Sequence, residues 1–389
     1  MSAPRVLLAS HAGVNVALMR RALVRRLLAE GAEVHVAVPR DAHFDAVAAL
    51  GVRVHPWAMA RGSLRPGAAL ASVAALRAIV AAARPQVVHA FTHQPNIFAR
   101  LAVGRARPLV NSVTGLGSNF LGQGAGGALR RAVFHTLYRA TRARCAALIF
   151  QNDDDRAHFA AHGLIGAAPA FMVRGTGVDV AALRPGAEDA ARVTAARAAL
   201  GLGPEHVVLT LAARLIRDKG VFEFLDAARA LAARHPRARF LLVGEPDPGN
   251  PTSLSPEAMD ATRADGAVVF AGWRDDMPLI WALSDVAVLP SYREGLPVSL
   301  QEALACGLPV VTTQAPGCRE IVAPGENGLL VPVGDAPALA RAMATLLDDP
   351  ALRQRMGQAG RRRAEALFNA DTLAGEIVAV YRRICKEFP

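Results

Sequence analysis

The chain has 389 residues, a formal net charge of +11, and 52% hydrophobic but only 5% aromatic residues. This length predicts two domains of ordinary size. No apolar run reaches the roughly 18 residues that a membrane span needs. The four cysteines, Cys145, Cys306, Cys318 and Cys385, follow neither a metal-binding spacing nor a disulfide framework. These features disfavour a membrane-spanning or disulfide-stapled protein, and predict a cytoplasmic one without a metal site.

The basic residues are concentrated in the first half of the chain. Residues 1–180 contain 21 Arg, no Lys and 8 acidic residues, whereas residues 181–389 are nearly neutral. A general preference for Arg over Lys does not explain this asymmetry, which favours an anionic partner: a membrane surface, a lipid diphosphate or nucleic acid. Because no nucleic-acid-binding motif accompanies the charge, we predict an anionic membrane surface as a partner and no nucleic acid.

Short apolar runs alternate with helix-periodic segments along the first half. Strands are predicted at residues 5–10, 33–38, 52–55, 86–89, 108–111, 146–150 and 170–173, and helices at 14–30, 68–83 and 128–143. This alternation predicts a doubly wound parallel α/β sheet. Ligands of such sheets bind beyond the carboxyl ends of the strands.

Three of these strand ends carry residues suited to binding. Gly13 follows the first strand and would let a phosphate or sugar approach the backbone. No complete G-x-G-x-x-G accompanies it, so a dinucleotide-dependent dehydrogenase is disfavoured. His89 and His93 lie around the end of the fourth strand, where a structural role explains them as well as a functional one. Residues 114–119, Thr-Gly-Leu-Gly-Ser-Asn, follow the fifth.

A basic helix is predicted over residues 128–143. It has an apolar stripe at Leu129, Val133, Leu137 and Thr141, and a second apolar edge at Phe134 and Tyr138. The interpretation slightly favoured is a stripe that faces the core beneath a solvated Arg face. The alternative is a surface helix whose Arg side chains dock on anionic lipid, at about 1 kcal/mol per residue.

Asn152 and the three Asp residues after it suit the start of another helix. Asn152 is a good N-cap, and residues 153–155 would then lie in the first turn, facing the positive end of the helix dipole. A metal-binding Asp-x-Asp is the weaker alternative for Asp153 and Asp155.

A second alternating series begins near residue 207. Strands are predicted at 207–211, 240–244, 268–272, 285–289 and 309–312, and helices at 221–234, 298–305 and 371–386. A second doubly wound sheet therefore follows the first.

The segment 290–302 of this second half combines carboxylates with a helix start. It places Glu294 in the loop after a buried strand and Glu302 inside a helix whose first residue is expected to be Pro297. The amides of Gly295, Val298 and Ser299 would lack helical partners and could bind an anion. Either Glu alone is more often a solvated surface residue, but the two together with this helix start suggest a site for a phosphorylated sugar.

Two cations follow the first strand of the second half. Lys219 is one of only two lysines in a chain that otherwise uses Arg, which suggests a need for a compact, mobile point charge. Arg214 can offer a forked pair of donors to diphosphate oxygens. A solvated loop is the weaker alternative.

These motifs resemble those of the retaining glycosyltransferases of family 4, which have the GT-B fold. The resemblance covers Glu294-x7-Glu302 and Arg214-x4-Lys219-Gly220, where Ala213 stands in place of the usual Gly. It implies two doubly wound parallel-sheet, Rossmann-like domains facing a cleft. Residues 1–180 would bind the acceptor, residues 181–370 the nucleotide sugar, and the helix within 371–389 would cross back to the first domain.

A narrower resemblance is to the branch that extends polyprenyl-diphosphate-linked sugars. It lies in residues 91–96, Phe-Thr-His-Gln-Pro-Asn, in residues 114–117 and in residues 150–156. Gln94 stands where this branch has Lys. Phe91 stands where many family members have a histidine near the donor sugar, and His93 is the candidate replacement.

The resemblance implies a role for each matching residue. The catalytic residues would be Arg214, Lys219, Glu294 and His93. The donor would contact Gly13, Arg214, Lys219, Arg274, Glu294, Gly295, Leu296, Val298, Ser299 and Glu302, with Glu302 on the ribose hydroxyls and Glu294 on the sugar hydroxyls. The acceptor would contact Thr92, Asn96, Thr114, Gly115 and Asn119. No cofactor is implied, because the UDP-sugar is a substrate.

The expected activity is metal-independent, retaining transfer of a sugar, with N-acetylhexosamine the best guess. The donor would be a UDP-sugar, and the acceptor a polyprenyl-diphosphate-linked glycan of surface polysaccharide assembly at the inner face of the cytoplasmic membrane. One alternative is a non-hydrolysing nucleotide-sugar epimerase on the same fold. Others are a glycoside hydrolase that uses Glu294 and Glu302 as acid and nucleophile, and a non-catalytic nucleotide-sugar-binding protein.

Overall fold

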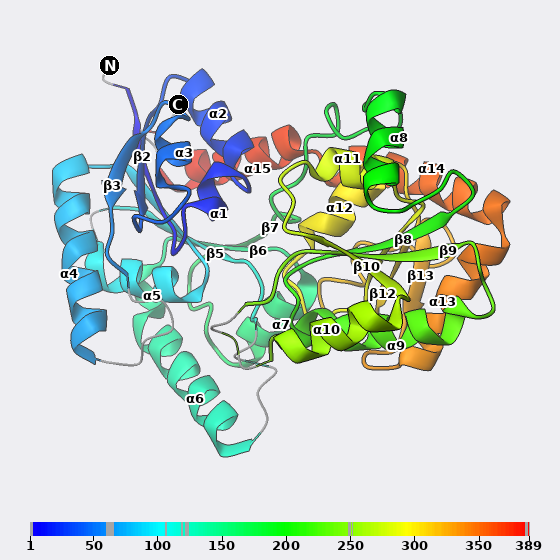
Figure 1. Cartoon of the computed structure of the whole chain (residues 1–389). Helices are drawn as coiled ribbons and strands as arrows, with labels where there is room; N and C mark the ends of the chain where they lie inside the picture. The colour runs from blue at the N-terminus through cyan, green and yellow to red at the C-terminus, as the bar shows by residue number, and fades with distance from the viewer. Residues whose placement is uncertain are drawn as a thin grey trace. The chain divides into compact units, whose positions relative to one another are not determined.

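The structure is a computed structural model that describes residues 3–59, 66–105, 107–117, 120, 124–247, 250, 252–385 and 388. The chain divides into two compact units (Figure 1): unit 1 is Met1–Gly177 with Ala370–Pro389, and unit 2 is Val178–Asn369. The expected ranges 1–180, 181–370 and 371–389 differ from these bounds by one to three residues. The assignment of acceptor and donor binding to the two units stays a prediction.

Unit 1 is built on a parallel sheet of seven strands. The strands are β1 (Arg5–Ala9), β2 (Glu33–Val38), β3 (Arg53–Pro56), β4 (Val87–Phe91), β5 (Leu109–Val113), β6 (Ala147–Phe150) and β7 (Ala170–Met172). Their order is β3-β2-β1-β4-β5-β6-β7. The order reverses at β1, so the switch point where ligands of such sheets bind lies between β1 and β4.

Helices cover both faces of the unit 1 sheet. They are α1 (Val14–Ala17), α2 (Arg21–Ala29), α3 (Phe44–Ala48), α4 (Pro66–Ala83), α5 (His93–Ala102), α6 (Gly124–Thr141), η2 (Arg142–Arg144), α7 (Asp153–Ala161) and α15 (Ala370–Ile384). One core joins the sheet to α2 and α15, and a second joins it to α4, α5, α6 and α7. Because both faces are covered, the central strands β4 and β5 are buried along their whole length rather than alternating between buried and exposed residues.

Unit 2 repeats this plan with six parallel strands. The strands are β8 (Val207–Ala212), β9 (Ala238–Val243), β10 (Val268–Gly272), β11 (Val286–Leu289), β12 (Val310–Thr313) and β13 (Gly328–Val331). The helices are α8 (Ala190–Ala199), η3 (Arg217–Lys219), α9 (Val221–Ala232), α10 (Pro256–Asp265), α11 (Met277–Ala282), α12 (Val298–Ala305), α13 (Ala336–Asp348) and α14 (Pro350–Leu367). The order β10-β9-β8-β11-β12-β13 puts the switch point between β8 and β11.

The predicted fold class, two doubly wound parallel α/β sheets, is confirmed. Of the helices in the described ranges, none combines the length and hydrophobicity that crossing a bilayer requires. One helix differs from its prediction, because residues 14–30 form two helices, α1 and α2. Between them, the Arg20 guanidinium donates to the carbonyl oxygen of Asn15 at 2.7 Å and stacks on Phe91 at 4.0 Å.

The favoured interpretation of the basic helix is wrong. Leu129, Val133 and Leu137 of α6 are 66%, 42% and 38% exposed, whereas Phe134 and Tyr138 are buried. The two aromatic rings pack in the core formed with α5 and α7. The stripe of three aliphatic side chains, called the α6 apolar face below, therefore points to solvent.

Candidate functional site

A partly buried ion pair lies at the switch point of unit 2. Lys219, at the end of η3 after β8, pairs its Nζ with Oε1 of Glu294, in the loop after β11. The two side chains are 20% and 11% exposed. Residues 75 positions apart in the sequence thus meet where the topology predicts ligand binding.

Two glycines allow these loops to approach so closely. Gly220 has φ +71°, and a Cβ there would lie 2.1 Å from the carbonyl oxygen of Pro290. Gly317 has φ +79°, and a Cβ there would lie 2.5 Å from the carbonyl oxygen of Glu294. No side chain fits in either gap, so both backbones require glycine.

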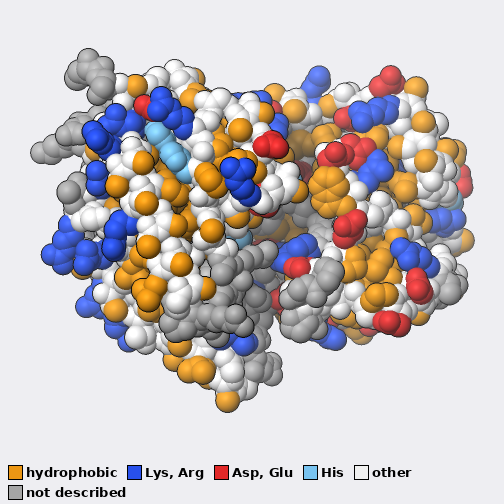
Figure 2. Space-filling model, turned by 60° about the vertical axis from the view of Figure 1, so that its left-hand side comes forward, with side chains coloured by type: hydrophobic (Ala, Val, Ile, Leu, Met, Phe, Trp, Pro, Cys, Tyr) orange, Lys and Arg blue, Asp and Glu red, His pale blue; other side chains and the backbone are white. Residues whose placement is uncertain are grey.

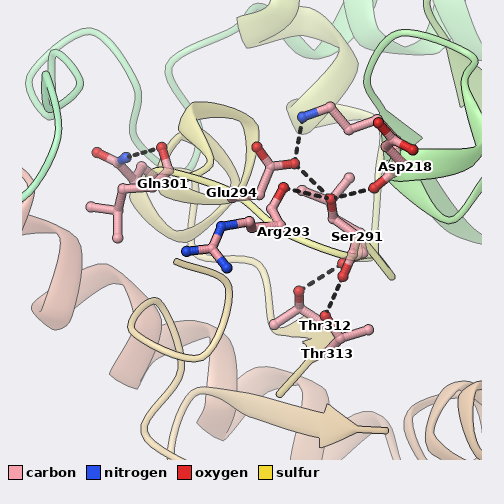
Figure 3. Close-up of polar contacts among 10 residues, drawn as sticks. Asp218, Ser291, Arg293, Glu294, Gln301, Thr312 and Thr313 are labelled. Atoms are coloured by element: carbon pink, nitrogen blue, oxygen red, sulfur yellow. Dashed lines mark hydrogen bonds and ion pairs between the residues drawn. The ribbon is translucent and has the colours of Figure 1, made fainter. Parts of the chain in front are cut away.

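Further hydrogen bonds fix the loop that carries Glu294 (Figure 3). The Ser291 hydroxyl lies 2.8 Å from both Glu294 Oε1 and the carbonyl oxygen of Asp218, and can donate to either. The Tyr292 amide donates to the same Asp218 oxygen at 2.9 Å. Thr313 Oγ1 donates to the Ser291 carbonyl at 2.5 Å. The carboxylate of Glu294 is therefore preorganised from both sides of the switch point.

Asp218 was missed by the sequence reasoning. Burial raises the pKa of its carboxyl group, while the nearby cations Lys219 and Arg214 oppose that rise and Glu294 adds to it. The charges of Lys219, Arg214 and Glu294 thus all influence this carboxyl group. No sequence signal singles out Asp218, because an Asp beside a Lys in a loop is commonplace.

Glu302 lies on α12 and has a different partner. Its Oε2 accepts a hydrogen bond of 3.0 Å from the indole Nε1 of Trp281, on α11. Burial raises the pKa of Glu302 to about 7, and the Trp281 hydrogen bond only partly offsets this. The carboxyl group is therefore poised to gain or lose a proton near neutral pH. Trp281 was not singled out from the sequence, because a Trp within an apolar helical pattern is predicted to be a core residue.

The anion site expected at the start of α12 stays a prediction, and the helix begins one residue later than expected. Pro297 is the N-cap rather than the first helical residue, and it offers no side-chain cap. Val298 and Ser299 therefore form the first turn, where amide groups have no partner within the helix. The loop residue Leu296 is buried in the core beneath α12, so its side chain anchors the turn. Gly295 lies in the same loop, beside Glu294.

The two predicted arginines of unit 2 are engaged by carboxylates. Arg214 Nη1 pairs with Asp247 Oδ2 at 2.5 Å, and the Arg214 side chain is 51% exposed. Arg274 makes a two-pronged contact with Asp276, at 2.8 and 2.6 Å. These hydrogen bonds lower the pKa of Asp276. An anionic ligand would share each guanidinium with a carboxylate or displace that carboxylate, because a guanidinium has five N–H donors.

The switch point of unit 1 carries a histidine–hydroxyl contact instead of an ion pair. His11 follows β1 and Thr92 follows β4. Nδ1 of His11 lies 2.9 Å from Oγ1 of Thr92. Thr92 has φ +72° and ψ 166°, a backbone region that side chains rarely adopt. Such strain persists only where the surroundings enforce it, and it is concentrated at functional sites.

His93 and Asn96 belong to a hydrogen-bond network within unit 1. His93 Nε2 donates to the carbonyl oxygen of Gly115 at 2.7 Å, and its Nδ1 lies 3.2 Å from the Tyr138 hydroxyl. Asn96 Nδ2 donates to the Ser112 carbonyl oxygen at 2.9 Å and to the Tyr138 hydroxyl at 3.3 Å. This geometry suits a structural role for His93, and its catalytic role stays a prediction.

The remaining predicted residues of unit 1 have mixed outcomes. The Gly13 amide donates to Asp41 Oδ2 at 2.7 Å, and a Cβ at Gly13 would lie 2.5 Å from the other oxygen of that carboxylate. Its lack of a side chain thus accommodates Asp41. Thr114 follows β5 and is half-buried, and Asn119 lies outside the described residues.

The N-cap predicted for α7 is confirmed. Asn152 Oδ1 accepts from the Asp155 amide at 2.7 Å, and its Nδ2 donates to Asp155 Oδ2 at 2.9 Å. Asp153 pairs with Arg156 at 2.8 Å. These contacts account for the run of Asp residues as a helix start.

Comparison with protein families identifies the class to which this fold and site belong. Residues 5–152 match the family described as "Glycosyl transferase 4-like", and residues 193–363 match "Glycosyl transferases group 1". Each match lies within one of the two units, and together they cover most of the chain. The protein is therefore a glycosyltransferase and belongs to the group 1, family 4 enzymes predicted from its motifs.

Individual relatives extend this result. The chain is 28% identical over 384 residues, covering 98% of it and 99% of the relative, to the N,N'-diacetylbacillosaminyl-diphospho-undecaprenol alpha-1,3-N-acetylgalactosaminyltransferase of Campylobacter jejuni. It is also 33% identical over 246 residues to the D-inositol 3-phosphate glycosyltransferase of Jonesia denitrificans, covering 61% of this chain and 57% of the relative.

Solved structures show the same fold. The sucrose-phosphate synthase of Thermosynechococcus elongatus superposes with a TM-score of 0.80 at 22% identity, over 98% of this chain and 99% of that one. The Anabaena protein HepE, in complex with UDP and glucose, gives a TM-score of 0.79 at 21% identity, over 97% and 99% of the two chains. At these identities the likeness establishes the GT-B fold alone.

Proposed function

We propose that this glycosyltransferase moves N-acetylhexosamine, with retention, from a UDP-sugar to a polyprenyl-diphosphate-linked glycan in surface polysaccharide assembly. The observation that carries the proposal is the Lys219–Glu294 pair, held by Ser291 at the switch point of unit 2. The C. jejuni relative, whose name specifies a diphospho-undecaprenol acceptor and an α-linked N-acetylgalactosamine product, supports the choice of substrates.

Donor binding would exchange the internal ion pairs for contacts with the ligand. Lys219 would turn from Glu294 to the diphosphate, leaving the carboxylate to accept hydrogen bonds from sugar hydroxyls. Arg214 would leave Asp247, at little cost because exposed ion pairs contribute only about 0–1 kcal/mol. The amides of Val298 and Ser299 would complete the anion site at the start of α12.

Retention needs no carboxylate nucleophile in this scheme. As the bond between the sugar and the UDP phosphate breaks, an oxygen of the leaving phosphate accepts the proton of the acceptor hydroxyl, which attacks from the same face. Lys219, Arg214 and the α12 amides would stabilise the negative charge of the departing UDP. Each such group contributes about 3 kcal/mol of barrier lowering, which is why we propose that the transfer is metal-independent.

The α6 apolar face suits the lipid side of the acceptor. Three exposed aliphatic side chains lie at intervals of four residues along α6. Arg130 and Arg139 are exposed on the same helix. Figure 2 shows basic and hydrophobic side chains interspersed on the surface of unit 1, with few acidic ones. A helix of this type binds the interface of an anionic membrane by apolar burial and charge together.

Transfer assays test the enzymatic proposal. The purified protein is incubated with a panel of UDP-sugars and short-chain prenyl-diphosphate glycans, and the anomeric configuration of the product is read by NMR. We expect an α-linked N-acetylhexosamine product, formed equally well with EDTA. Release of a free sugar isomer without acceptor would favour an epimerase. Hydrolysis of a nitrophenyl glycoside without nucleotide would favour a glycoside hydrolase.

Flotation with liposomes tests the membrane docking. We expect the protein to float with vesicles that contain anionic lipid, and the double variant Leu129→Ser, Leu137→Ser to lose most of that binding. Leu70→Ser is the matched control, because Leu70 is 69% exposed but lies on α4. Equal flotation with neutral vesicles, or equal loss in the control, would contradict docking through α6.

A further inference from the structure

Three histidines of unit 1 that belong to neither predicted binding site converge on one another. His135 lies on α6, His158 lies on α7, and His162 is the C-cap residue of α7. One ring nitrogen from each lies within 4.8 Å of the others. All three side chains are half-buried, so the cluster is reached from solvent. We call these residues the His cluster.

The spacing within the His cluster is close to that of metal ligands. His158 and His162 are four residues apart, so they lie on one face of the helix, and His135 comes from a helix 23 residues earlier. His135 Nε2 and His158 Nε2 are 3.0 Å apart. Two imidazole nitrogens bound tetrahedrally at about 2.0–2.1 Å from Zn²⁺ would be separated by roughly 3.3 Å. A metal ion replacing the shared proton would therefore require only a small displacement of the rings.

His162 is oriented in the way that metal-binding histidines usually are. Its Nδ1 lies 2.8 Å from the carbonyl oxygen of His158, which can only accept, so Nδ1 carries the proton. In the neutral ring, Nε2 then holds the lone pair that a metal needs. A backbone carbonyl that fixes the tautomer of a ligating histidine is a common outer-shell partner.

We propose that the His cluster binds one divalent transition-metal ion of the zinc class, with water as the fourth ligand. Three neutral imidazoles suit Zn²⁺, Co²⁺, Ni²⁺ and Cu²⁺ better than Mg²⁺ or Ca²⁺, which prefer oxygen ligands. The site lies outside the donor and acceptor residues, and it does not depend on the proposed function. It departs from the expectation of no metal site, which rested on cysteine spacing.

The surroundings set the character of this site. Arg139 Nη2 donates to the carbonyl oxygen of His162 at 2.9 Å, and Arg131 also lies near His135. The positive charges of these arginines repel a metal cation. The affinity of the His cluster for a metal ion therefore depends on the geometry of its three ligands. The ion would link α6 to α7, and thus hold the helix that carries the α6 apolar face.

Metal titration of the untagged, full-length protein tests the site. The protein is treated with EDTA, desalted and titrated with Zn²⁺ against a chromophoric chelator, and with Co²⁺ to detect the absorption of tetrahedral coordination. We expect one equivalent of Zn²⁺ to bind and to slow amide exchange in α6. His158→Ala should weaken binding by more than about 100-fold, because loss of an outer-shell partner alone costs about 10–100-fold.

A matched control separates this site from the other histidine pair of unit 1. His35 Nδ1 and His55 Nε2 are 2.8 Å apart, so His55→Ala removes a ligand from that pair. We expect His55→Ala to bind Zn²⁺ as the wild type does. His135→Asn serves as a second variant if His158→Ala does not fold, as judged by circular dichroism. No Zn²⁺ binding by the wild type, or loss in His55→Ala rather than in the cluster variants, would overturn the proposal.

Discussion

The two units use the same topological position in opposite ways. In each sheet, the residues after the first strand meet those after the strand across the switch point: Lys219 meets Glu294 in unit 2, and His11 meets Thr92 in unit 1. The first contact is an ion pair and the second is a contact between a histidine ring and a hydroxyl group. An ion pair can exchange partners with an ionic ligand, whereas a histidine–hydroxyl contact offers hydrogen bonding to a ligand. The difference suggests that unit 2 handles the anionic donor.

Removing the positive charge of Lys219 in unit 2 is expected to have the largest effect. Lys219→Ala should lower kcat/KM by about 10²–10³, because one preorganised charge-stabilising group contributes about 2.7–4 kcal/mol. Arg217→Ala is the control: Arg217 lies on the same 3-10 helix but stacks on Phe222, at 4.7 Å. Its activity should fall less than about threefold. Near-normal turnover in Lys219→Ala would contradict the phosphate role.

The close approach of the unit 2 loops gives the next largest effect. Gly220→Ala would place a Cβ 2.1 Å from the Pro290 carbonyl oxygen, and should destabilise the protein by about 3 kcal/mol or more. Gly266→Ala has the same φ of +71° but nothing within 4 Å, so it should cost only about 1 kcal/mol. Urea unfolding measures both. Equal losses would show that backbone strain, rather than the contact with Pro290, determines the stability.

Glu302 gives unit 2 a pH dependence. Its folded pKa of about 7 lies above the roughly 4.3 of an unfolded Glu, so the folded chain binds this proton more tightly. The stabilisation is complete below about pH 4.3 and is lost as the pH rises through 7.

Glu302→Gln should remove this loss. Between pH 5.5 and pH 8.5, the unfolding free energy of the variant should rise relative to that of the wild type by about 1–3 kcal/mol. Urea unfolding at both values measures it, with the exposed Glu326→Gln as control. If the difference in unfolding free energy between variant and wild type is the same at both pH values, the raised pKa of Glu302 is contradicted.

The smallest effect is expected in the hydrogen-bond network around His93 in unit 1. His93→Ala leaves the Gly115 carbonyl oxygen and the Tyr138 hydroxyl without their histidine partner. We expect the unfolding free energy to fall by about 1–3 kcal/mol, with transfer activity reduced less than in Lys219→Ala. Unchanged stability with a larger loss of kcat would show that His93 acts in catalysis, and would reverse the comparison of the two units.

Most of the fold was accessible from the sequence because parallel strands buried on both faces give continuous apolar runs. The segment 290–302 and Lys219 were likewise visible, since a carboxylate after a buried strand and a rare lysine are local signals. The orientation of α6 was not, because two apolar edges compete and only packing decides that Phe134 is buried. The contact of Asp218 with Ser291 joins two distant loops, and the contact of Trp281 with Glu302 joins two helices. No local pattern encodes either contact.

Helix α15 determines the order in which the two units can be completed during synthesis. Leu373, Ile377 and Tyr381 fill the core that α15 shares with α2 and β1, and the Tyr381 hydroxyl lies 2.6 Å from Nδ1 of the buried His89. The ribosome delivers these side chains after all of unit 2. A nascent chain that ends at residue 369 would therefore contain every residue of unit 2 while one wall of the older unit stands open. Unit 1 begins first along the chain but is therefore the last of the two units to have all of its residues synthesised.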